Sequence, residues 1–432
     1  MSALQYKRKS MSANTAKTII IGAGPAGLMA AGSLKYGGAA VLEKNEKAGK
    51  KLYITGKGRC NLTNDCSGAD VQKNAVTNPK FLFSALNAFP PREAMRLFES
   101  CGVPLKTERG GRVFPASDKA SDVTAALKKY ALAGGAQIRL NAEAQSVWFD
   151  GKSQKFHVRL TDGAELASDS LIIATGGKSY PATGSTGDGY RFAKAFGHTV
   201  VPPRPALVPL VLHEDVKPLE GLSLENVSVS VSSGGKTYRQ PLGEMVFTAQ
   251  GASGPCILSL SSLLSRDGLA EGARLSVDLK PGLSAAQLEA RILRDFEKYK
   301  NKQLKNALFE LLPKSLISYI IGYAGLDGET AVHSVTKPQR AILLNALKSL
   351  TFTIKSLDAL EKGIVTGGGV SVGEINPKTL ESKLVKNLYF AGEVLDVDAL
   401  TGGYNIQIAL STGYLAGSSI TTRNAQRTTR NG

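Results

Sequence analysis

The fold is decided by Thr18-Ile19-Ile20-Ile21-Gly22-Ala23-Gly24-Pro25-Ala26-Gly27-Leu28, a β-branched run that ends on the spacing G-x-G-x-x-G. This spacing is typical of a glycine-rich turn that binds a dinucleotide, which we call the cradle. In such a turn Gly22 permits a tight bend, Gly24 lets the backbone approach a pyrophosphate, and Gly27 lets helix and strand pack closely. The helix that follows supplies N–H groups and the positive end of its dipole. The stretch therefore predicts a strand, a phosphate-binding turn and a helix.

A second strand ends in an acid at Ala39-Ala40-Val41-Leu42-Glu43. Glu43 follows the glycines by about 20 residues, the spacing at which an acid accepts hydrogen bonds from both hydroxyls of an adenosine ribose. A lone G-x-G-x-x-G is a weak signal. The preceding strand, the apolar helix and the acid together indicate a nucleotide site.

Length and composition favour an α/β protein of two or three domains. The chain has 432 residues, of which 42% are hydrophobic, and strand patterns alternate with helical ones. The four cysteines lack the paired spacing of a metal site or a disulfide framework, so we expect no metal and a reducing, cytoplasmic environment. No apolar run reaches the roughly 20 residues of a membrane span, and we expect no membrane partner.

The charge is strongly unbalanced. Lys and Arg number 53 against 36 Asp and Glu, a formal net charge of +17. Nucleotide binding needs only a local patch, so an excess of this size indicates a polyanionic partner. General solubility is the alternative interpretation.

A buried strand over Ser170–Gly177 ends on small residues. The backbone at Thr175 and Gly176 can therefore approach a cofactor closely. The glycine-rich segment Gly184–Gly189 follows and leads into an expected helix. It is either a second anion site or a turn.

Near the C-terminus, Asn387–Glu393 is predicted to be a strand that ends in an acid. A helix is predicted to begin at Thr401–Asn405. A cradle first in the chain and an acid-ended strand last is the order that a bound flavin needs. FAD is long, so its adenine half and its ring half must be held by widely separated pieces of chain. Glu393 would hydrogen-bond the ribityl chain. The N–H groups near Gly403 and Asn405 would face the edge of the ring where negative charge collects on reduction.

Several segments resemble the motif set of the BaiN/RdsA-type NAD(P)/FAD-dependent flavoproteins, over about residues 17–418. They are Thr55–Asn64, Gly111–Pro115, Thr366–Val370, Gly392–Asp398 and Thr401–Asn405. The resemblance implies FAD as the bound cofactor. With the cradle, it predicts a binding set of Gly22, Gly24, Ala26, Gly27, Glu43, Lys44, Gly58, Arg59, Cys60, Asn61, Thr175, Gly176, Gly392, Glu393, Gly403, Tyr404 and Asn405.

The resemblance also implies a glutathione-reductase-like Rossmann FAD domain, interrupted by an insert. We expect a discontinuous FAD domain over residues 17–203 plus 350–420, an inserted β-barrel-like domain over 204–280 and a helical domain over 281–349. Short alternating strands in the β insert and helical periodicity after it agree with this division. Residues 1–16 and 421–432 are expected to be flexible tails.

The helical segment carries a cluster of lysines at Lys298, Lys300, Lys302 and Lys305. These side chains are either a solvated helix face or one wall of a groove for a polyanion. No second G-x-G-x-x-G with a following acid is evident, so we expect NAD(P)H to dock transiently against the flavin.

The family is associated with two reductions of a C=C bond conjugated to a carbonyl. One substrate is a steroid-like enone, and the other is uracil in ribosomal RNA, which becomes dihydrouridine. The charge favours uridine in ribosomal RNA as the substrate, with a small-molecule enone as the alternative. A flavin-bearing RNA-binding protein without turnover is a third hypothesis.

Such a reduction needs a hydride donor and an acid. We expect Cys60 to be the acid, with a pKa near neutrality tuned by the adjacent Arg59. Cys60 can instead simply pack beneath the ring. Tyr180, Tyr404 and Arg59 are alternatives, Arg59 more as a clamp for a carbonyl or a phosphate. No C-x-x-C spacing is present, which disfavours a disulfide reductase.

Overall fold

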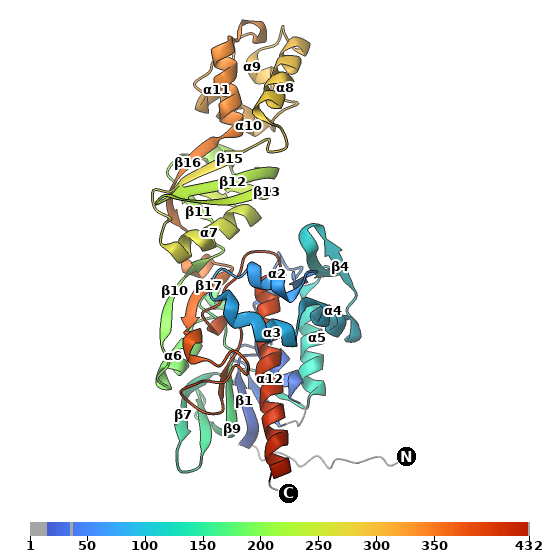
Figure 1. Ribbon diagram of the computed structural model, residues 1–432, viewed down its shortest axis with the longest axis vertical. Coiled ribbons are helices and arrows are strands. Elements are labelled where there is room, and N and C mark those ends of the chain that lie inside the picture. The colour runs from blue at the N-terminus through green and yellow to red at the C-terminus, as the bar shows by residue number, and fades with distance from the viewer. Residues whose placement is uncertain (1–14, 35–37, 431–432) are drawn as a thin grey trace. The chain divides into compact units, whose positions relative to one another are not determined.

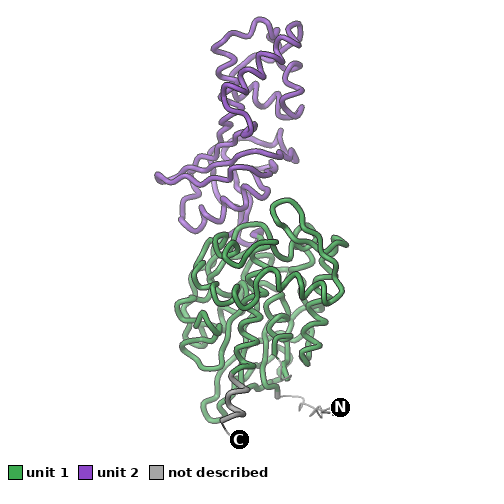
Figure 2. The backbone as a smooth tube through the Cα atoms, turned by 45° about the vertical axis from the view of Figure 1, so that its right-hand side comes forward, with its two compact units in different colours: residues 1–204, 364–432 green, residues 205–363 purple. Residues whose placement is uncertain are grey.

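The computed structural model describes residues 15–34 and 38–430 and divides the chain into two compact units (Figure 2). Unit 1 comprises residues 1–204 and 364–432, and unit 2 comprises residues 205–363. The expected N-terminal tail lies outside the described residues as far as residue 14, and the first strand begins at Thr15.

Unit 1 is built on a seven-stranded sheet in the order β6-β2-β1-β9-β8-β7, with β18 also paired to β9. The pairs β1–β2, β1–β9, β2–β6 and β9–β18 are parallel, and β7 and β8 extend the sheet in antiparallel fashion. The strands are β1 (Thr15–Ile21), β2 (Ala39–Leu42), β6 (Gln137–Arg139), β7 (Ala144–Asp150), β8 (Lys155–Leu160), β9 (Glu165–Ile173) and β18 (Leu388–Phe390).

Helices and two smaller sheets complete unit 1 (Figure 1). The helices are α1 (Pro25–Ser33), α2 (Gly68–Lys73), α3 (Phe83–Ala88), α4 (Pro91–Ser100), α5 (Ala120–Ala133), α6 (Asp188–Ala195) and α12 (Tyr404–Arg430). A three-stranded sheet has the order β3-β5-β4, and β10 pairs with β17. These strands are β3 (Thr63–Asn64), β4 (Leu105–Glu108), β5 (Arg112–Pro115), β10 (Val200–Ala206) and β17 (Val365–Val370).

The two helices α1 and α12 approach each other closely because glycines face backbone. A Cβ on Gly413 would lie 2.3 Å from the carbonyl oxygen of Ala26, and one on Gly417 would lie 2.3 Å from that of Ala30. The segment expected to be a flexible tail from residue 421 continues α12 as far as Arg430, and Thr421 at its start is buried and bonds to α1. Residues 431–432 lie outside the described part.

Unit 2 contains a closed antiparallel barrel in the order β11-β14-β13-β12-β15-β16, which confirms the barrel-like insert. Its strands are β11 (Leu210–Leu212), β12 (Ser223–Ser233), β13 (Lys236–Thr248), β14 (Gly251–Ser253), β15 (Arg274–Asp278) and β16 (Leu350–Leu357). Its helices are α7 (Pro255–Asp267), α8 (Ala285–Lys298), α9 (Leu304–Ala307), α10 (Lys314–Tyr323) and α11 (Lys337–Lys348), which share one apolar core with the barrel.

The expected return to the FAD domain at residue 350 is wrong. Strand β16 begins at Leu350, which lies opposite Val277 of β15, and the strand also pairs with β11. Without β16 the barrel would be left with two open edges. The chain therefore returns to unit 1 at Ile364.

Candidate functional site

Four parallel strands of unit 1 end at one edge of the sheet, and predicted site residues follow each of them. Gly22 follows β1, Glu43 follows β2, Thr175 comes shortly after β9, and Glu393 comes shortly after β18. In open α/β sheets, ligands bind outside the carboxyl ends of the strands. The fold thus gathers residues from distant parts of the sequence at the edge where a nucleotide cofactor is expected.

The three glycines of the cradle differ in their surroundings as their predicted roles require. Gly22 has a φ of 104°, and a Cβ there would lie 2.4 Å from the carbonyl oxygen of Ala174. A Cβ on Gly27 would lie 1.9 Å from the carbonyl oxygen of Gly22. A Cβ on Gly24 would meet nothing within 4 Å. A side chain at Gly22 or Gly27 would therefore clash with the backbone, whereas the space beside Gly24, at the start of α1, is open.

Glu43 is buried and ties the cradle to the end of β2. Its Oε2 accepts a hydrogen bond from the backbone N–H of Ala23 at 3.0 Å, and its Oε1 accepts from the side chain of Asn45 at 2.6 Å. The carboxylate thus lies directly beside the glycine turn. This is the position expected of an acid that binds the adenosine ribose.

The glycine-rich segment after β9 packs on the residues that follow Glu43. Lys44 Nζ lies 2.7 Å from Asp188 Oδ2, and Asn45 Nδ2 donates to the carbonyl oxygen of Thr183 at 3.2 Å. Gly184 and Gly187 have positive φ angles of 102° and 85°. Because a carboxylate stands at the start of α6, this segment is a turn that buttresses the cradle. Lys44 directs its ammonium group to Asp188.

Glu393 is held by a polar network made of three distant segments. Its carboxylate accepts hydrogen bonds from Lys51 Nζ at 3.0 Å, from Ser179 Oγ at 3.2 Å and from the backbone N–H of Thr366 at 2.9 Å. Lys51 Nζ also donates to Ser179 Oγ at 2.7 Å. A Cβ on Gly177 would lie 2.8 Å from Glu393 Oε1, so only glycine fits against this carboxylate.

The segment Gly58–Asn61, with the sequence GRCN, and the residues that follow it pack closely against the start of α12. A Cβ on Gly403 would lie 2.3 Å from the carbonyl oxygen of Thr63 and 2.9 Å from Asn61 Oδ1. Asn64 Nδ2 donates to the carbonyl oxygen of Gly402 at 3.0 Å. The structure therefore brings Asn61 and Gly403 together, as expected for two segments that hold one end of a cofactor.

The side chain of Asn405 binds its own loop. Its Oδ1 accepts from the backbone N–H of Ala399 at 2.9 Å, and its Nδ2 donates to the carbonyl oxygen of the same residue at 2.8 Å. Tyr404 is half-buried, and burial raises the pKa of its phenol. The Asn405 amide thus fixes the loop before α12.

Four buried side-chain atoms near these segments have no hydrogen-bond partner within residues 15–34 and 38–430: Asn61 Oδ1, Thr175 Oγ1, Tyr190 OH and Asp396 Oδ1. Burial and the charges of Glu393 and Asp396 raise the pKa of Tyr190. A buried polar atom without a partner costs about 1–3 kcal/mol. Together with the open space at Gly24, these atoms fit a polar cofactor such as FAD.

The expectation of a Cys60 thiol with a pKa near neutrality is wrong. Cys60 is fully buried, and burial raises its pKa to about 12. The Arg59 guanidinium does not tune this thiol, because its Nε lies 2.7 Å from Asp118 Oδ1 and its other end pairs with Glu108. The guanidinium also stacks over the ring of Phe114, 4.2 Å from the centroid.

The loop that carries Cys60 has an unusual backbone. Gly56, Lys57, Gly58 and Cys60 all have positive φ angles, between 58° and 85°. A left-handed conformation is unfavourable for Lys and Cys, and such strain clusters at functional sites. The strained loop runs directly into Asn61, at the predicted cofactor edge.

Sequence reasoning missed three residues of this site. Lys51 and Ser179 bond to the Glu393 carboxylate, and Gln407 accepts a hydrogen bond from Thr63 Oγ1 at 2.6 Å. Lys51 lies in a lysine-rich segment that is typical of a solvated surface, so its residue type did not indicate a role in the site. Gln407 follows the GGYN segment by two positions, and that proximity was an available signal.

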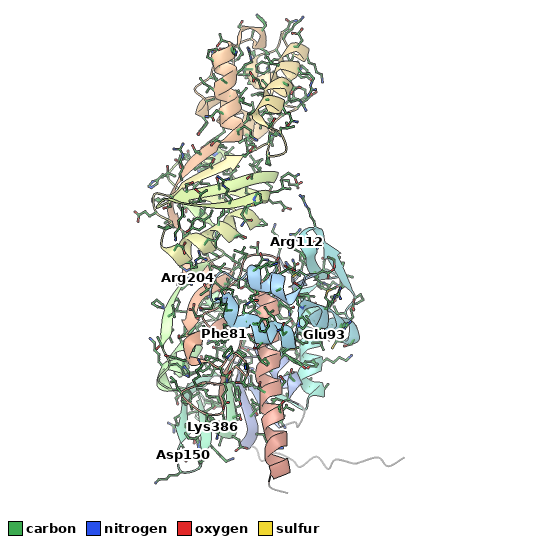
Figure 3. All side chains as sticks on the ribbon, in the orientation of Figure 1. Phe81, Glu93, Arg112, Asp150, Arg204 and Lys386 are labelled. Carbon is green, nitrogen blue, oxygen red and sulfur yellow. The ribbon has the colours of Figure 1, made fainter. Side chains whose placement is uncertain are left out.

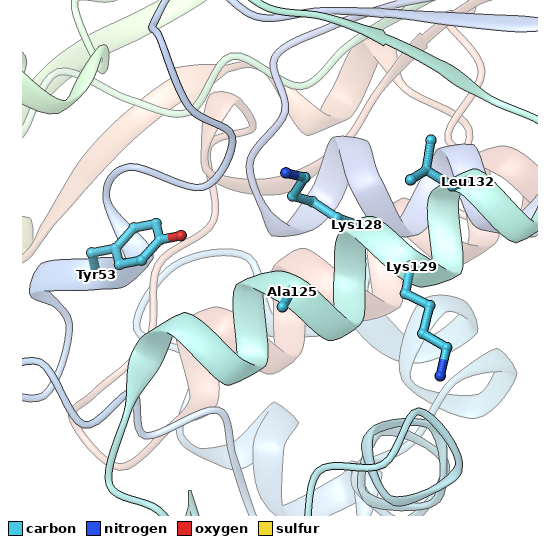
Figure 4. Close-up of a pocket in the computed structure, with 5 residues that line it drawn as sticks. All are labelled: Tyr53, Ala125, Lys128, Lys129 and Leu132. Atoms are coloured by element: carbon cyan, nitrogen blue, oxygen red, sulfur yellow. The ribbon is translucent and has the colours of Figure 1, made fainter.

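An open depression on α5 contains none of the predicted site residues. It is lined by Tyr53, Ala125, Lys128, Lys129 and Leu132 (Figure 4). Elsewhere, the described residues include no group of three or more His, Cys, Asp or Glu side chains able to hold a metal ion. Nor do they include a helix long and apolar enough to cross a membrane.

Comparison with known proteins assigns the chain to a family. The sequence profile of the HI0933-like protein Rossmann domain matches residues 16–419. The chain belongs to this family. This confirms the resemblance found in the motifs.

Members of the HI0933-like family with assigned activities cover nearly the whole chain. A 3-dehydro-bile acid delta(4,6)-reductase of Clostridium scindens is 33% identical over 92% of this chain and 97% of that protein. Ribosomal RNA dihydrouridine synthases of Haemophilus influenzae and Escherichia coli are 32% and 31% identical, over 94% and 92% of this chain and 98% and 96% of theirs.

One solved structure has a fold similar to that of the whole chain. The 3-ketosteroid delta1-dehydrogenase of Sterolibacterium denitrificans superposes with a TM-score of 0.51 at 13% identity, covering 95% of this chain and all of that one. At this identity the likeness concerns the fold alone.

Proposed function

We propose that the protein is an FAD-dependent oxidoreductase that uses NAD(P)H to reduce a conjugated C=C bond, and that its substrate is uridine in ribosomal RNA. The convergence of Gly24, Glu43, Glu393 and Gly403 at one sheet edge supports the cofactor. The net charge of +17 carries the choice of substrate, because a polyanion needs such a surface and a small steroid with at most one charge does not.

The residues of unit 1 would divide the work of holding the cofactor. The backbone at Gly24 and the N-terminus of α1 would face the pyrophosphate, and Glu43 would exchange its present hydrogen bonds for the ribose hydroxyls. Glu393 would bind the ribityl chain, and the N–H groups that begin α12 would face the ring. Bound FAD would supply the chemistry of accepting a hydride from NAD(P)H and delivering it to one carbon of the substrate double bond.

Cys60 remains the proposed proton donor, for a reason different from the expected one. Its raised pKa keeps the thiol protonated at neutral pH, which is the state that a proton donor needs. As the hydride arrives at one carbon, the proton of Cys60 Sγ would pass to the neighbouring carbon. Because the thiol is buried, its loop would have to open for this transfer and for the thiolate to regain a proton from water. The C=C bond thus becomes a C–C bond with one new hydrogen on each carbon.

A small-molecule enone is the second candidate substrate. The observation that favours it is the identity of 33% with the bile-acid reductase, slightly above the 32% and 31% with the dihydrouridine synthases. Both substrates present a C=C bond beside a carbonyl, so the same site chemistry serves both.

The test uses the purified flavoprotein, NAD(P)H and either ribosomal RNA or a steroid enone. We expect NAD(P)H to bleach the flavin and ribosomal RNA to restore its colour, with dihydrouridine appearing in the digested RNA. Reoxidation by the enone alone would establish the second candidate. A flavin that NAD(P)H cannot bleach would favour an RNA-binding flavoprotein without turnover.

A further inference from the structure

The inserted unit 2 does not hold the charge excess. Residues 205–363 contain 18 Lys and Arg and 16 Asp and Glu, so nearly all of the net charge of +17 belongs to the rest of the chain. A polyanion that is attracted by this excess must therefore contact unit 1.

The lysine cluster of unit 2 is largely neutralised. Lys298 Nζ lies 2.8 Å from Glu310 Oε1, Lys300 Nζ lies 3.5 Å from Glu297 Oε1, and Lys305 pairs with Glu329. Lys302 lies over the rings of Tyr299 and Phe309. These contacts favour a solvated helix face over a groove for a polyanion.

A compact basic surface is present in unit 1 on the sheet β3-β5-β4 and the adjoining GRCN loop. We call it the basic sheet surface; its six cations are Lys57, Arg59, Lys106, Arg109, Arg112 and Lys119. Four carboxylates lie among or beside them: Asp65, Glu108, Asp118 and Asp122. The cations therefore still outnumber the carboxylates on this compact surface.

Hydrogen bonds and strand pairing join these segments into one surface. The carbonyl oxygen of Gly58 accepts a hydrogen bond from the backbone N–H of Ala120 at 2.9 Å, which brings Lys57 near Lys119. Asp118 accepts from both Arg59 and Lys106. Arg112 lies opposite Glu108 in the register of β4 and β5. Figure 3 shows Arg112 at the outer end of this sheet.

Two of the cations are available for a ligand. Lys57 and Lys119 are exposed, and neither has a carboxylate within 4.0 Å in the part of the chain that the structure describes. The loop that holds Lys57 and Arg59 continues into Cys60 and Asn61, at the candidate flavin edge. A polyanion on this surface would therefore lie next to the reacting site.

We infer that the basic sheet surface binds the RNA backbone phosphates that flank the reduced uridine. This inference rests on the proposed function and deepens it. Lysine and arginine bind phosphate by charge and hydrogen bonding, and a base that is pulled from its stack needs its flanking backbone held. A bile-acid enone carries a single carboxylate and would use at most one or two of these cations.

The test measures binding of a fluorescent RNA hairpin with a uridine loop to the flavin-loaded protein, as a function of salt. We compare the variant Lys57→Gln, Arg112→Gln, Lys119→Gln with a control that removes the same number of charges from unit 2, Lys298→Gln, Lys300→Gln, Lys302→Gln. Flavin absorbance checks that each variant is folded.

The inference predicts that the unit 1 variant binds roughly tenfold or more weakly, with a salt slope reduced by about 2, while the control binds like the wild type. Equal affinity of the unit 1 variant and the wild type, or equal losses in both variants, would overturn the inference alone. Polyglutamate that displaced the RNA as well as unlabelled RNA does would also overturn it, in favour of an acidic protein partner. A wild type that binds no RNA would overturn the proposed function as well.

Discussion

The ammonium group of Lys51 lies 3.0 Å from Glu393 Oε2, although the two residues are 342 positions apart in the sequence. Each side chain is 21% exposed, so the pair is only partly screened by water. It joins the segment after the cradle to the segment after β18. The contact fixes the carboxylate that is proposed to bind the ribityl chain.

Replacing Lys51 with Met should leave this carboxylate without its cation. We expect the free energy of unfolding to fall by about 1–3 kcal/mol and the purified protein to contain less FAD. Urea unfolding and the ratio of flavin to protein absorbance measure these changes. Lys50→Met is the matched control, because Lys50 pairs with the exposed Glu46, and it should change neither. Equal behaviour of the two variants would show that the Lys51 contact is not needed.

The cradle glycines provide a matched pair of substitutions. Gly24→Val should cost little stability beyond a weakened N-cap, because a Cβ there meets nothing within 4 Å, but it should abolish FAD binding. Gly27→Ala should cost about 3 kcal/mol or more, since its Cβ would strike the Gly22 carbonyl. Circular dichroism and FAD titration separate the two effects. A Gly24→Val protein that binds FAD normally would contradict the position assigned to the pyrophosphate.

The Cys60 thiol should resist alkylation in the folded protein. At pH 8 a thiol with a pKa of about 12 is almost wholly protonated, and it is also buried. Iodoacetamide followed by peptide mass spectrometry should label the partly exposed Cys101 first, and Cys60 only after unfolding. Labelling of Cys60 as fast as Cys101 would mean that the thiol is open to solvent.

The same thiol should make the protein less stable at alkaline pH. The unfolded thiol loses its proton near pH 8.5, whereas the folded one holds it to about pH 12. Above pH 9 the native state therefore binds more protons, and the free energy of unfolding falls by up to about 1.4 kcal/mol per pH unit. Urea unfolding at pH 8 and pH 10 should show a shallower fall in Cys60→Ala; an identical slope would refute the raised pKa.

If Cys60 donates the proton, Cys60→Ala should still permit flavin bleaching by NAD(P)H but should form product more slowly. Stopped-flow absorbance follows the first step, and nucleoside mass spectrometry follows the second. Equal loss of both steps, or unchanged product formation, would reject the role.

The sequence predicted the parts of the site that depend on backbone geometry. Gly22 and Gly27 show themselves by spacing, because close backbone contacts tolerate only glycine, and Glu43 and Glu393 show themselves by ending apolar strands. Lys51 could not be found in this way, since its partner is an acid hundreds of residues away. The pKa of Cys60 also depends on tertiary burial, which Arg59 as a sequence neighbour did not reveal.

Domain boundaries were predicted less well where one hydrophobic pattern is compatible with two different folds. The alternating residues of β16 suit a Rossmann strand and a barrel strand equally, and only the pairing with β11 and β15 decides between them. Likewise, the lysines at positions 298–305 fit either a solvated helix face or a groove for a polyanion until their glutamate partners are known.

The measurement that tests the central claim most directly is nucleoside mass spectrometry of ribosomal RNA from cells with and without this gene. The account predicts that dihydrouridine disappears on deletion and returns with the wild-type gene but not with Gly24→Val. An unchanged dihydrouridine content in the deletion strain, with no redundant enzyme present, would contradict reduction of ribosomal RNA by this protein.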